Sequence, residues 1–474
     1  RAALLDAAAA GNRLACLCAD GDGWLYAVMA DDQAGRLRLG RARLPGESFA
    51  ALTPALPAAH LFEREIAEQF AFVPEEHPWL KPVRFHRAWR DGADAWNRPP
   101  GEEILPGVCE MFRVEGDEVH EVAVGPVHAG VIEPGHFRFQ CHGETVFHLE
   151  INLGYQHRGA EQALIGGPDR RSLSRVETLA GDTSIGHAWA WCQALEALGG
   201  CAPTPRAQAI RRIALELERL ANHTGDLGAL AGDVGFLPTA SFNGRIRGDW
   251  LNLSALLCGS RLGRGLLQPG GVRFDLDAQR AATLRERLLK VRRDMTGSND
   301  LLWATPSVQA RFEGVGLLKP EDARAVGLVG VARRACGDAL DVRRQHGAGV
   351  WTDVPVASAT TGDVDARARV RAAEVQTSCD LILRELEHLP AGPLTAPCAA
   401  PKADHLAVSL VEGWRGEVLH LLKTGADGRL ARVKVVDPSF HNWFGLALAL
   451  RDEQISDFPL CNKSFNLSYC GYDL

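Results

Sequence analysis

A stretch of histidines and carboxylates restricts the fold and chemistry of this chain more than any other feature. Between Gly125 and Glu196, five of the sixteen His residues fall within thirty positions, and His187 follows them. The carboxylates among them are Glu133, Glu144, Glu150, Glu161 and Asp182. Imidazoles and carboxylates concentrated in otherwise apolar sequence are typical of a proton-handling or metal site. The alternative is a set of hydrogen-bonded polar groups on a small sheet.

The order of motifs within this stretch is more specific than its composition. G-P-x-H begins at Gly125, E-P-G-H-F-R at Glu133 and Y-x-H-R-G-x-E at Tyr155. This series resembles the large subunit of membrane-bound nickel–iron hydrogenases of the formate hydrogenlyase type and, more loosely, the quinone-pocket (49 kDa-type) subunit of respiratory complex I. Further motifs of both families are P-R-A-Q-x-I-R at 205–211, E-R-L-x-x-H at 218–223, R-A-C-G-D-A-L-D-V-R at 334–343 and R-V-K-V-V-D-P-S-F-H-N-W at 432–443. The resemblance therefore covers 126–474 almost continuously.

Two domains and a linker are expected along the chain. Residues 1–95 predict a small α+β domain, whose E-R-E-x-x-E-x-F motif at 63–70 resembles the small hydrophilic (30 kDa-type) subunit of complex I. Formate hydrogenlyase-type enzymes carry that subunit fused ahead of the large one. Residues 96–125 predict an exposed linker rich in Pro and Gly. Residues 126–474 predict a large, mainly helical domain like the hydrogenase large subunit, with a small antiparallel sheet over 126–155, so the expected fold class is α+β.

Periodicity predicts most of the regular structure within these domains. Paired strands are expected over 13–18 and 24–29. Helices are expected over 2–10, 61–72, 178–198, 205–220, 248–256, 277–295, 320–325 and 363–389, and another helix is expected to begin at 157–163.

Charge and cysteine content exclude several functional classes. A net charge of −7 and a pI near 6.2 argue against nucleic-acid binding. The twelve Cys residues form no C-x-x-C pair and no signal peptide precedes them, so reduced thiols and a cytoplasmic location are expected. No apolar run approaches the roughly 18 residues that span a bilayer. A peripheral position on the cytoplasmic side of the cell membrane, reached through partner subunits, is therefore expected.

The resemblance implies a nickel–iron site, yet other residues occupy its thiolate positions. The family binds nickel with two C-x-x-C pairs. When the sequence is placed on His187 and on S-D-F-P-L at 456–460, the four Cys positions fall on Ala180, Thr183, Ser468 and Gly471. None of these residues supplies the thiolate that such a centre needs. No metal or other cofactor is expected on this chain, Fe–S clusters are expected in partner subunits, and hydrogenase activity of its own is not expected.

The likeness to complex I implies a quinone pocket in which a Tyr and a His hold the quinone head. In this sequence those two positions fall on Ala180 and Ile132, which offer neither a hydroxyl nor an imidazole, although His128 is retained. A quinone in the vacated cleft is therefore an alternative rather than the main expectation.

The polar framework around the cleft is retained. Glu133 and His136 match the proton-handling residues of the hydrogenases, and Asp182 adds a carboxylate where the family has a small or apolar residue. A buried carboxylate can carry protons near neutral pH, because burial raises its pKa. The surrounding residues implied by the resemblance are His128, Arg138, His157, Arg158, Glu161, His187, Arg334, Asp341 and Arg343. The alternative is simple charge neutralisation, with the pairs Arg138 and Glu133, Arg158 and Glu161, and Arg334 and Asp341.

Three functions are compatible with these observations. The first is a peripheral-arm subunit of a redox-driven, ion-translocating membrane complex, whose cleft transmits redox or protonation changes without activating hydrogen. The partners that the resemblance implies are a small Fe–S subunit, a ferredoxin-like Fe–S subunit, antiporter-like membrane subunits and a membrane anchor. The second is a purely structural scaffold. The third is a reductase that uses the cleft for a quinone or another acceptor.

The C-terminal residues are expected to fill the space that the metal would occupy. Hydrogenases of this family often lose a terminal peptide after nickel insertion, and no such tail is expected here. The alternation of apolar and polar residues in 461–474 predicts a partly buried strand beside 178–187. Asp473 is expected beside an arginine such as Arg138 or Arg334, because an unpaired buried charge is costly.

Overall fold

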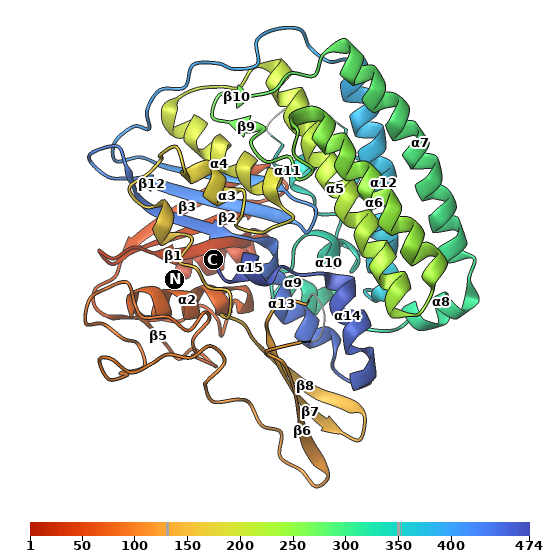
Figure 1. Cartoon of the computed structure of the whole chain (residues 1–474). Coiled ribbons are helices and arrows are strands. Elements are labelled where there is room, and N and C mark those ends of the chain that lie inside the picture. Colours follow the sequence, from red (N-terminus) through yellow and green to blue (C-terminus); the bar gives the residue numbers. More distant parts are fainter. Residues whose placement is uncertain (129–131, 348–350, 352) are drawn as a thin grey trace.

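Two stacked antiparallel sheets and a bundle of long helices make up most of the molecule (Figure 1). The computed structural model describes residues 1–128, 132–347, 351 and 353–474. The first sheet comes from the N-terminal residues and the second from residues 406–436, so distant parts of the sequence meet in the core. One buried apolar cluster runs from the N-terminal sheet through the bundle to the C-terminal helices.

The N-terminal residues form the compact α+β unit that the sequence predicts. Strands β1, β2 and β3 pair antiparallel in that order, and helix α2 packs across β1. This helix buries Phe62, Ile66 and Phe70, at the spacing of an amphipathic helix. The elements of this region are α1 (Ala2–Ala9), β1 (Arg13–Ala19), β2 (Trp24–Asp31), β3 (Arg36–Arg43), β4 (Ser48–Ala50), η1 (Pro57–Ala59), α2 (His60–Phe70) and β5 (Val73–Glu75).

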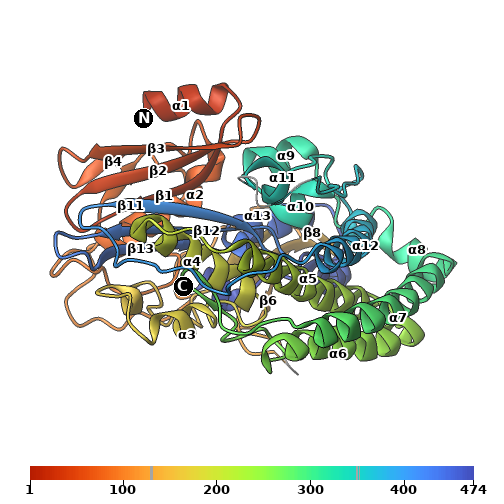
Figure 2. The same ribbon diagram turned by 90° about the horizontal axis from the view of Figure 1, so that it is seen from above.

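A second sheet lies between the N-terminal unit and helix α4 (Ser184–Gly199) (Figure 2). Its antiparallel strands are β11 (Leu406–Glu412), β12 (Glu417–Thr424) and β13 (Leu430–Val436). Nearly every residue of the three strands is buried, because both faces are covered. Strands buried on both faces lack the alternation of apolar and polar residues by which strands are recognised, and the sequence analysis did not predict this sheet.

Buried charges join the N-terminal unit to the second sheet. The Nζ of Lys434 lies 2.7 Å from Glu65 of α2 and 3.0 Å from Glu161, and all three side chains are at most 1% exposed. Arg432 lies 3.1 Å from Glu161 and donates a hydrogen bond to the carbonyl of Ala19 at 2.9 Å. An unpaired charge in this position would be costly, so the network holds the two parts in one arrangement.

The helical bundle lies beside the two sheets (Figure 1). Its members are α5 (Pro205–Asp233), α6 (Leu237–Cys258), α7 (Ala278–Trp303) and α12 (Val364–Glu387). Helix α5 packs against both α6 and α12, and α7 packs against the same two helices. Polar side chains begin three of these helices: Thr204, Asp277 and Asp363 each accept a hydrogen bond from a backbone N–H of the first turn, which is the usual N-cap arrangement.

A third antiparallel sheet projects from the body of the molecule (Figure 1). Its strands are β6 (Val119–Val124), β7 (His136–His142) and β8 (Thr145–Asn152), and β8 packs against α13 (Pro438–Ala449). The sequence predicts a sheet over 126–155; β6 precedes that range, and 129–131 lie outside the described residues. The remaining short elements are η2 (Gln162–Leu164), α3 (Ser172–Val176), β9 (Leu267–Gln268), β10 (Gly271–Val272), α8 (Pro306–Phe312), α9 (Pro320–Ala325), α10 (Gly330–Arg334), α11 (Val342–Gln345) and η3 (Ile455–Asp457).

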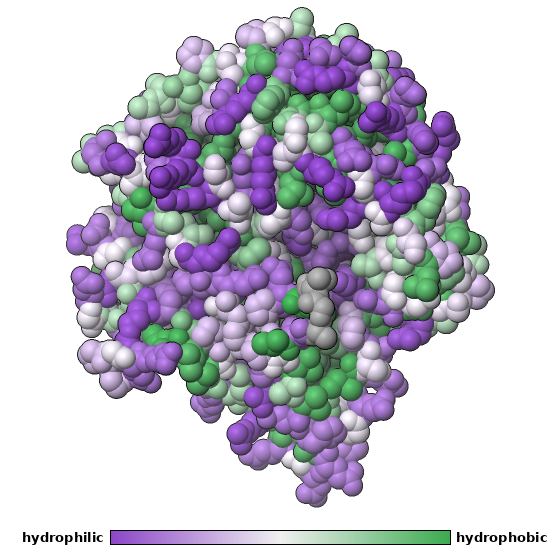
Figure 3. All heavy atoms as spheres, viewed as in Figure 1, coloured by the Kyte–Doolittle hydropathy of each residue, from purple (hydrophilic) through white to green (hydrophobic). Residues whose placement is uncertain are grey.

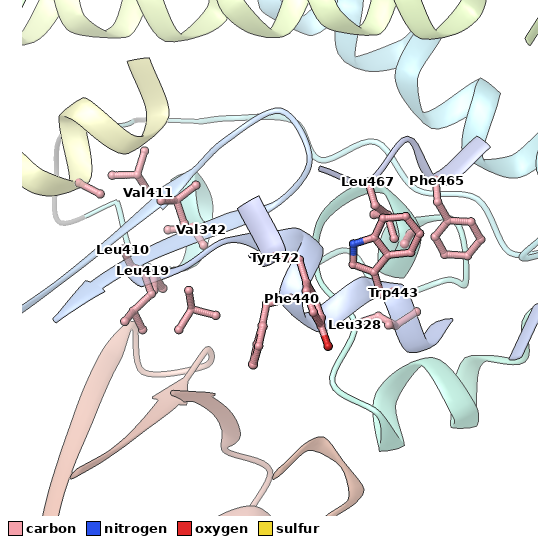
Figure 4. Close-up of a cluster of buried hydrophobic side chains, with 14 of the residues drawn as sticks. Leu328, Val342, Leu410, Val411, Leu419, Phe440, Trp443, Phe465, Leu467 and Tyr472 are labelled. Carbon is pink, nitrogen blue, oxygen red and sulfur yellow. The ribbon is translucent and has the colours of Figure 1, made fainter. Parts of the chain in front are cut away.

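The C-terminal residues form the helices α14 (Phe458–Phe465) and α15 (Tyr469–Tyr472), so the predicted terminal strand is wrong. A proline in the first turn favours α14, and the hydroxyl of Ser468 caps α15. Figure 4 shows Tyr472 next to Phe440 of α13, and their ring centroids are 5.4 Å apart. The apolar residues that alternate in the sequence still enter the core, but from a helical backbone.

The predicted α+β fold class is confirmed, with a large helical part and small antiparallel sheets. Several predicted helices differ in their bounds: the helix expected over 205–220 continues to Asp233, and the one expected over 248–256 begins already at Leu237. The helix expected over 178–198 begins only at Ser184, and the region 157–163 leads into the 3-10 turn η2 rather than an α-helix.

The surface in Figure 3 carries apolar side chains in patches that polar side chains interrupt. None of the helices in the described part of the chain is both long enough and apolar enough to cross a membrane.

The domain boundaries lead to a first prediction. Residues 96–118 contain no helix or strand and are mostly exposed or half-buried, so limited subtilisin digestion of the folded chain should first cut between Asn97 and Gly107. The two fragments should still elute together from a sizing column, because the buried charges of Lys434, Glu65 and Glu161 hold them. First cuts confined to the interior of 1–95 or of 126–474 would contradict the proposed linker.

Candidate functional site

The four positions at which the family resemblance would place cysteine lie at the junction of α4, α13 and α15. Ala180 precedes α4, Thr183 is the residue before its first turn, and Ser468 holds the same place before α15. These residues and Gly471 are all buried. A Cβ atom added to Gly471 would lie 2.7 Å from the Cγ of Asp437. The backbone therefore admits no side chain at 471 unless Asp437 moves.

Asp437 connects this junction to a buried pair of histidines. Its carboxylate accepts a hydrogen bond from the N–H of Ser439 at 2.8 Å, which caps α13, and lies 3.0 Å from Nε2 of His187. Nδ1 of His187 is 3.1 Å from Nε2 of His420. Burial disfavours the charged form of Asp437, but the hydrogen bond and charge of His187 outweigh it and hold the pKa of Asp437 below its ordinary value. Burial, reinforced by His187, lowers the pKa of His420 well below its ordinary value, so this imidazole is neutral.

An ion pair fills the space beside Thr183. Two guanidinium nitrogens of Arg415 lie 2.6 and 2.8 Å from the carboxylate oxygens of Asp182, and this bidentate geometry belongs to the stronger class of hydrogen bonds. Arg415 also donates to Oγ1 of Thr183 at 3.3 Å and to the carbonyl of Asn466 at 2.5 Å. The predicted proton-handling residue Asp182 is thus tied to the C-terminal segment through one cation.

One thiol reaches the junction, from Cys470. Its Sγ lies 3.4 Å from Oγ of Ser468 and accepts a hydrogen bond from the N–H of Gly181. Burial raises the pKa of this thiol, and the nearby carboxylate of Glu133 raises it further, so the group is a thiol rather than a thiolate at neutral pH. The prediction that 461–474 lies beside 178–187 is confirmed.

Glu218 of α5 is a buried carboxyl group at the N-terminus of α4. Its oxygens accept hydrogen bonds from the N–H groups of Ile185 at 2.7 Å and Gly186 at 3.2 Å. Burial nevertheless raises the pKa of Glu218 to about 8, and the negative charge of Asp182 acts in the same direction. A cavity of about 10 Å³ lies between Glu218 and Asp182. At neutral pH this carboxyl group therefore holds a proton close to the cleft.

Three of the other predicted residues lie on the projecting sheet or the loop before it. Arg138 of β7 pairs with Glu121 of β6 rather than with Glu133, so that predicted pair is wrong. His136 begins the same strand, and burial together with Arg138 lowers the pKa of His136. His128 hydrogen-bonds to the backbone just before β7.

Glu161 and its neighbours lie at the contact with the N-terminal unit. Glu161 pairs with the buried cations of β13 and not with Arg158, which corrects the second predicted pair. Arg158 instead donates to the carbonyls of the two residues before Ala180 at 3.1 and 3.2 Å. His157 stacks on His86 with ring centroids 4.6 Å apart, and burial lowers the pKa of His157 to about 3.

Arg334, Asp341 and Arg343 belong to a separate buried cluster behind the cleft. Arg343 lies 2.6 Å from Asp341, and Arg334 lies 3.9 Å from the same carboxylate. The third predicted pair is therefore present, with Arg343 as the nearer cation.

Asp473 does not have the partner that the sequence suggests. Its carboxylate accepts hydrogen bonds from two backbone N–H groups that follow β8, at 2.8 and 3.0 Å. Burial raises the pKa of Asp473 to about 6, against the opposing charge of Arg84. Arg138 and Arg334 are engaged elsewhere, so the expectation that one of them neutralises Asp473 is wrong.

The side chains that usually bind metals are scattered in the part of the chain that the structure describes. Within it, no three His, Cys, Asp or Glu side chains are placed so that they could hold a metal ion together.

Comparisons with known proteins place this geometry in a family. Residues 233–405 match the model of the respiratory-chain NADH dehydrogenase 49 kDa subunit. Formate hydrogenlyase subunit 5 of Escherichia coli is 31% identical over 440 residues, which cover 90% of this chain and 77% of the relative. The carbon monoxide-induced hydrogenase of Rhodospirillum rubrum is 33% identical over 350 residues, covering 73% of this chain and 97% of the relative. The chain belongs to this family of hydrogenase and complex I subunits.

Two further similarities describe the extent of the relationship within the family. The C/D subunit of the NADH-quinone oxidoreductase of Bacteroides thetaiotaomicron is 28% identical over 402 residues, covering 78% of this chain and 74% of the relative. A chain of the membrane-bound sulfane sulfur reductase, an archaeal respiratory membrane complex, superimposes with a TM-score of 0.70 at 22% identity, covering 75% of this chain and 99% of that chain. The match over 90% of this chain extends into residues 1–125.

The sequence analysis did not single out four residues that shape the site of this family member. Asp437 and Glu218 lie inside motifs that carry the family resemblance, so their position within a motif was an available signal. His420 and Arg415 lie in or next to strands of the second sheet, which the sequence analysis did not predict, and no motif marked them.

The raised pKa of Glu218 leads to a second prediction. A carboxyl group whose folded-state pKa is raised contributes stability that is complete below its unfolded pKa and is lost as the pH rises through about 8. Relative to Glu218→Gln, the wild-type chain should therefore lose stability between pH 5 and pH 9, by an amount on the order of a few kcal/mol. Chemical denaturation at several pH values measures this difference. Glu385→Gln, which removes a partner of Arg212, is the control, and parallel pH profiles of wild type and Glu218→Gln would contradict the prediction.

Proposed function

We propose that this chain is a peripheral-arm subunit of a membrane-bound, redox-driven, ion-translocating complex, and that its cleft transmits protonation or redox changes without a nickel–iron centre. The chain would connect a small Fe–S subunit and a ferredoxin-like Fe–S subunit to an antiporter-like membrane arm, on the cytoplasmic side of the cell membrane. The proposal that the chain works in a multi-subunit oxidoreductase complex is supported by its relatives, which are named as formate hydrogenlyase, hydrogenase and NADH-quinone oxidoreductase subunits.

The observation that carries this proposal is the chemistry at the four family cysteine positions. A nickel–iron centre of the kind that the resemblance implies would be held by four cysteine thiolates, which are soft ligands suited to such metals. Ala180, Thr183, Ser468 and Gly471 supply a methyl group, two hydroxyls and a hydrogen atom. The thiol of Cys470 is a single donor, and its raised pKa disfavours the thiolate. These residues do not fit the metal centre.

Groups that hold protons support a role in proton transfer. Glu218 carries a proton at neutral pH, and it lies beside Asp182 at the mouth of a small cavity. The negative charge of Glu133 raises the pKa of the Cys470 thiol, and Asp437 and His187 form a buried pair at the same junction. A change in charge at the buried groups Glu218, Asp437 or His187 alters the electrostatic potential around them strongly, because buried charges are weakly screened.

A purely structural role is the second candidate, and the pairing of Asp182 with Arg415 favours it. A bidentate ion pair of this kind holds the loop before α4 against the turn that carries Arg415. The third candidate, a reductase for quinone or another acceptor, has less support. The cavity beside Asp182 measures about 10 Å³, whereas pockets for small molecules measure roughly 300–1,000 Å³. An acceptor beside Asp182 would need a larger space than this cavity provides.

The third prediction concerns nickel. The chain purified from cells grown with added nickel should contain far less than one equivalent by elemental analysis, and its complex should not consume hydrogen. Replacing Cys470 with Ser should leave the nickel content unchanged, because this thiol has no partner thiolates. Stoichiometric nickel in the wild-type complex would refute the proposal.

The fourth prediction separates a proton-handling role from a structural one. In the purified complex, Glu133→Gln and Asp182→Asn should each reduce electron-transfer turnover, on the order of tenfold or more for a proton-transfer group, while the complex keeps all of its subunits. Glu144→Gln, in the exposed turn between β7 and β8, is the control and should have no effect. Normal turnover of both cleft variants in an assembled complex would favour the scaffold.

A further inference from the structure

A buried cluster of charges behind the cleft contains more acids than bases. The ionic hub, as we name it, comprises Glu216, Arg219, His223, Arg334, Asp341, Arg343, Glu374 and Glu412. Every one of these side chains is at most 2% exposed. The hub has four carboxylates and three guanidinium groups, and burying one uncompensated negative charge is costly. Electroneutrality therefore requires one additional proton within the hub.

Three of the four carboxylates are well supplied with cations. Glu374 lies 2.8 Å from Arg334 and 3.5 Å from Arg219, and its other close neighbour is Nε2 of His223 at 2.7 Å. The pKa of Glu374 lies well below its ordinary value because these charges outweigh the effect of burial. Such a carboxylate stays ionised.

The other two ionised members share Arg343. Glu216 lies 2.8 Å from Arg343 and 3.2 Å from Arg219, and it accepts a hydrogen bond from the Ser378 hydroxyl at 2.6 Å. Asp341 lies 2.6 Å from Arg343. Burial opposes ionisation at both sites, but these cations hold the pKa values of Glu216 and Asp341 below their ordinary range.

Glu412, on β11, is the hub carboxylate whose negative charge is least neutralised by nearby guanidinium groups. Among the described residues, Arg334 at 2.7 Å is the one cation that pairs with Glu412, and Arg334 is shared with Glu374. The other oxygen of Glu412 accepts a hydrogen bond from the N–H of Val342 at 3.0 Å. Burial raises the pKa of Glu412, and the neighbouring Asp341 adds to this shift against the opposing charges of Arg334 and Arg219. Glu412 is the hub carboxylate that best retains a proton.

His223 is the other group in the hub that could bind the excess proton, and it is a poorer site than Glu412. Within the described residues, nothing accepts a hydrogen bond from its Nδ1. A protonated imidazole would thus bury an N–H group without a partner, which is unfavourable. Burial accordingly lowers the pKa of His223, although Glu374 opposes the shift.

A cavity next to Glu412 has room for a hydrogen-bond acceptor of the protonated carboxyl group. A cavity of about 30 Å³ is bounded by Glu412, Arg343, Gln193, His346 and Trp351, among other residues. A polar cavity of this size can hold one or two water molecules, and a water molecule there could accept a hydrogen bond from a protonated carboxyl group. The charged groups that face this cavity are the guanidinium of Arg343 and the imidazole of His346, which itself lies 2.8 Å from Asp32.

We propose that the ionic hub binds one excess proton, held on the carboxyl group of Glu412 and hydrogen-bonded into the adjacent cavity. The site lies outside the cleft of the cysteine positions and does not depend on the function proposed above. The proton affinity of Glu412 then depends on the positions of the three arginines of the hub. A movement of Arg334 away from Glu412 would raise this affinity, because it would remove the positive charge that favours the carboxylate.

Infrared difference spectroscopy on the full-length chain tests this fifth prediction directly. The spectrum of wild type minus Glu412→Gln, recorded at pH 7, should contain the C=O stretching band of a protonated carboxylic acid, and this band should shift in D₂O. Glu374→Gln removes one negative charge from the same hub, so Glu412 should then ionise and the band should be lost. Glu385→Gln changes the same residue type outside the hub and should retain the band. A difference spectrum without this band would overturn the proposal, because bands of other protonated carboxyl groups such as Glu218 are common to both proteins and cancel.

Thermal unfolding supplies a second measurement. Gln reproduces the shape of a protonated Glu, so Glu412→Gln should unfold within about 2 °C of wild type at pH 7. Glu374→Gln leaves Arg334 and Arg219 without their shared carboxylate and should unfold several degrees lower. Equal and large destabilisation by both substitutions would contradict the assignment. If Glu374→Gln does not fold, the infrared band and its loss in Glu412→Gln decide the question.

Discussion

The position of the Asp437 carboxylate is the constraint on which the rest of the candidate site depends. This one group caps α13, binds His187 of α4 and occupies the space against Gly471 of α15. A fully buried anion is tolerated only when its hydrogen bonds are satisfied, so three helices must meet at this point in a single arrangement. The ion pair of Asp182 and Arg415 then connects the same junction to the loop before α4 and to the second sheet.

Buried charges also determine how the two halves of the chain fit together. The N-terminal unit supplies Glu65, and the second sheet supplies Lys434 and Arg432, which meet at Glu161. Networks of this kind add little stability compared with apolar packing, but removal of one member is strongly destabilising. Complementary charges therefore specify one orientation of the N-terminal unit, whereas apolar contact alone would allow several.

Much of this architecture could be predicted from the sequence, and the failures share a physical cause. Amphipathic helices such as α2 and α5 are recognisable from the helical spacing of their apolar residues. The motifs around Glu133 and His187 identified both the family and the junction. The second sheet was missed because its strands are covered on both faces. Two of the three predicted ion pairs were also wrong. Residues that are neighbours in a motif, such as Glu161 and Arg158, point to different layers, and the cations of Glu161 come from β13, far away in the sequence. Pairing between distant charges depends on tertiary structure, which single-sequence patterns do not contain.

The close contact between Gly471 and Asp437 also bears on how reversible the chemistry of this chain is. A cysteine at 471 would displace the Asp437 carboxylate from His187, and disrupting such a buried pair costs about 3–5 kcal/mol. A first cysteine at this position would thus weaken the fold before any other thiolate was present to compensate. Four thiolates at this junction would require simultaneous substitutions in the loop before α4 and at α15, together with a displacement of Asp437 at the start of α13. The packing at this glycine therefore opposes any stepwise acquisition of metal ligands.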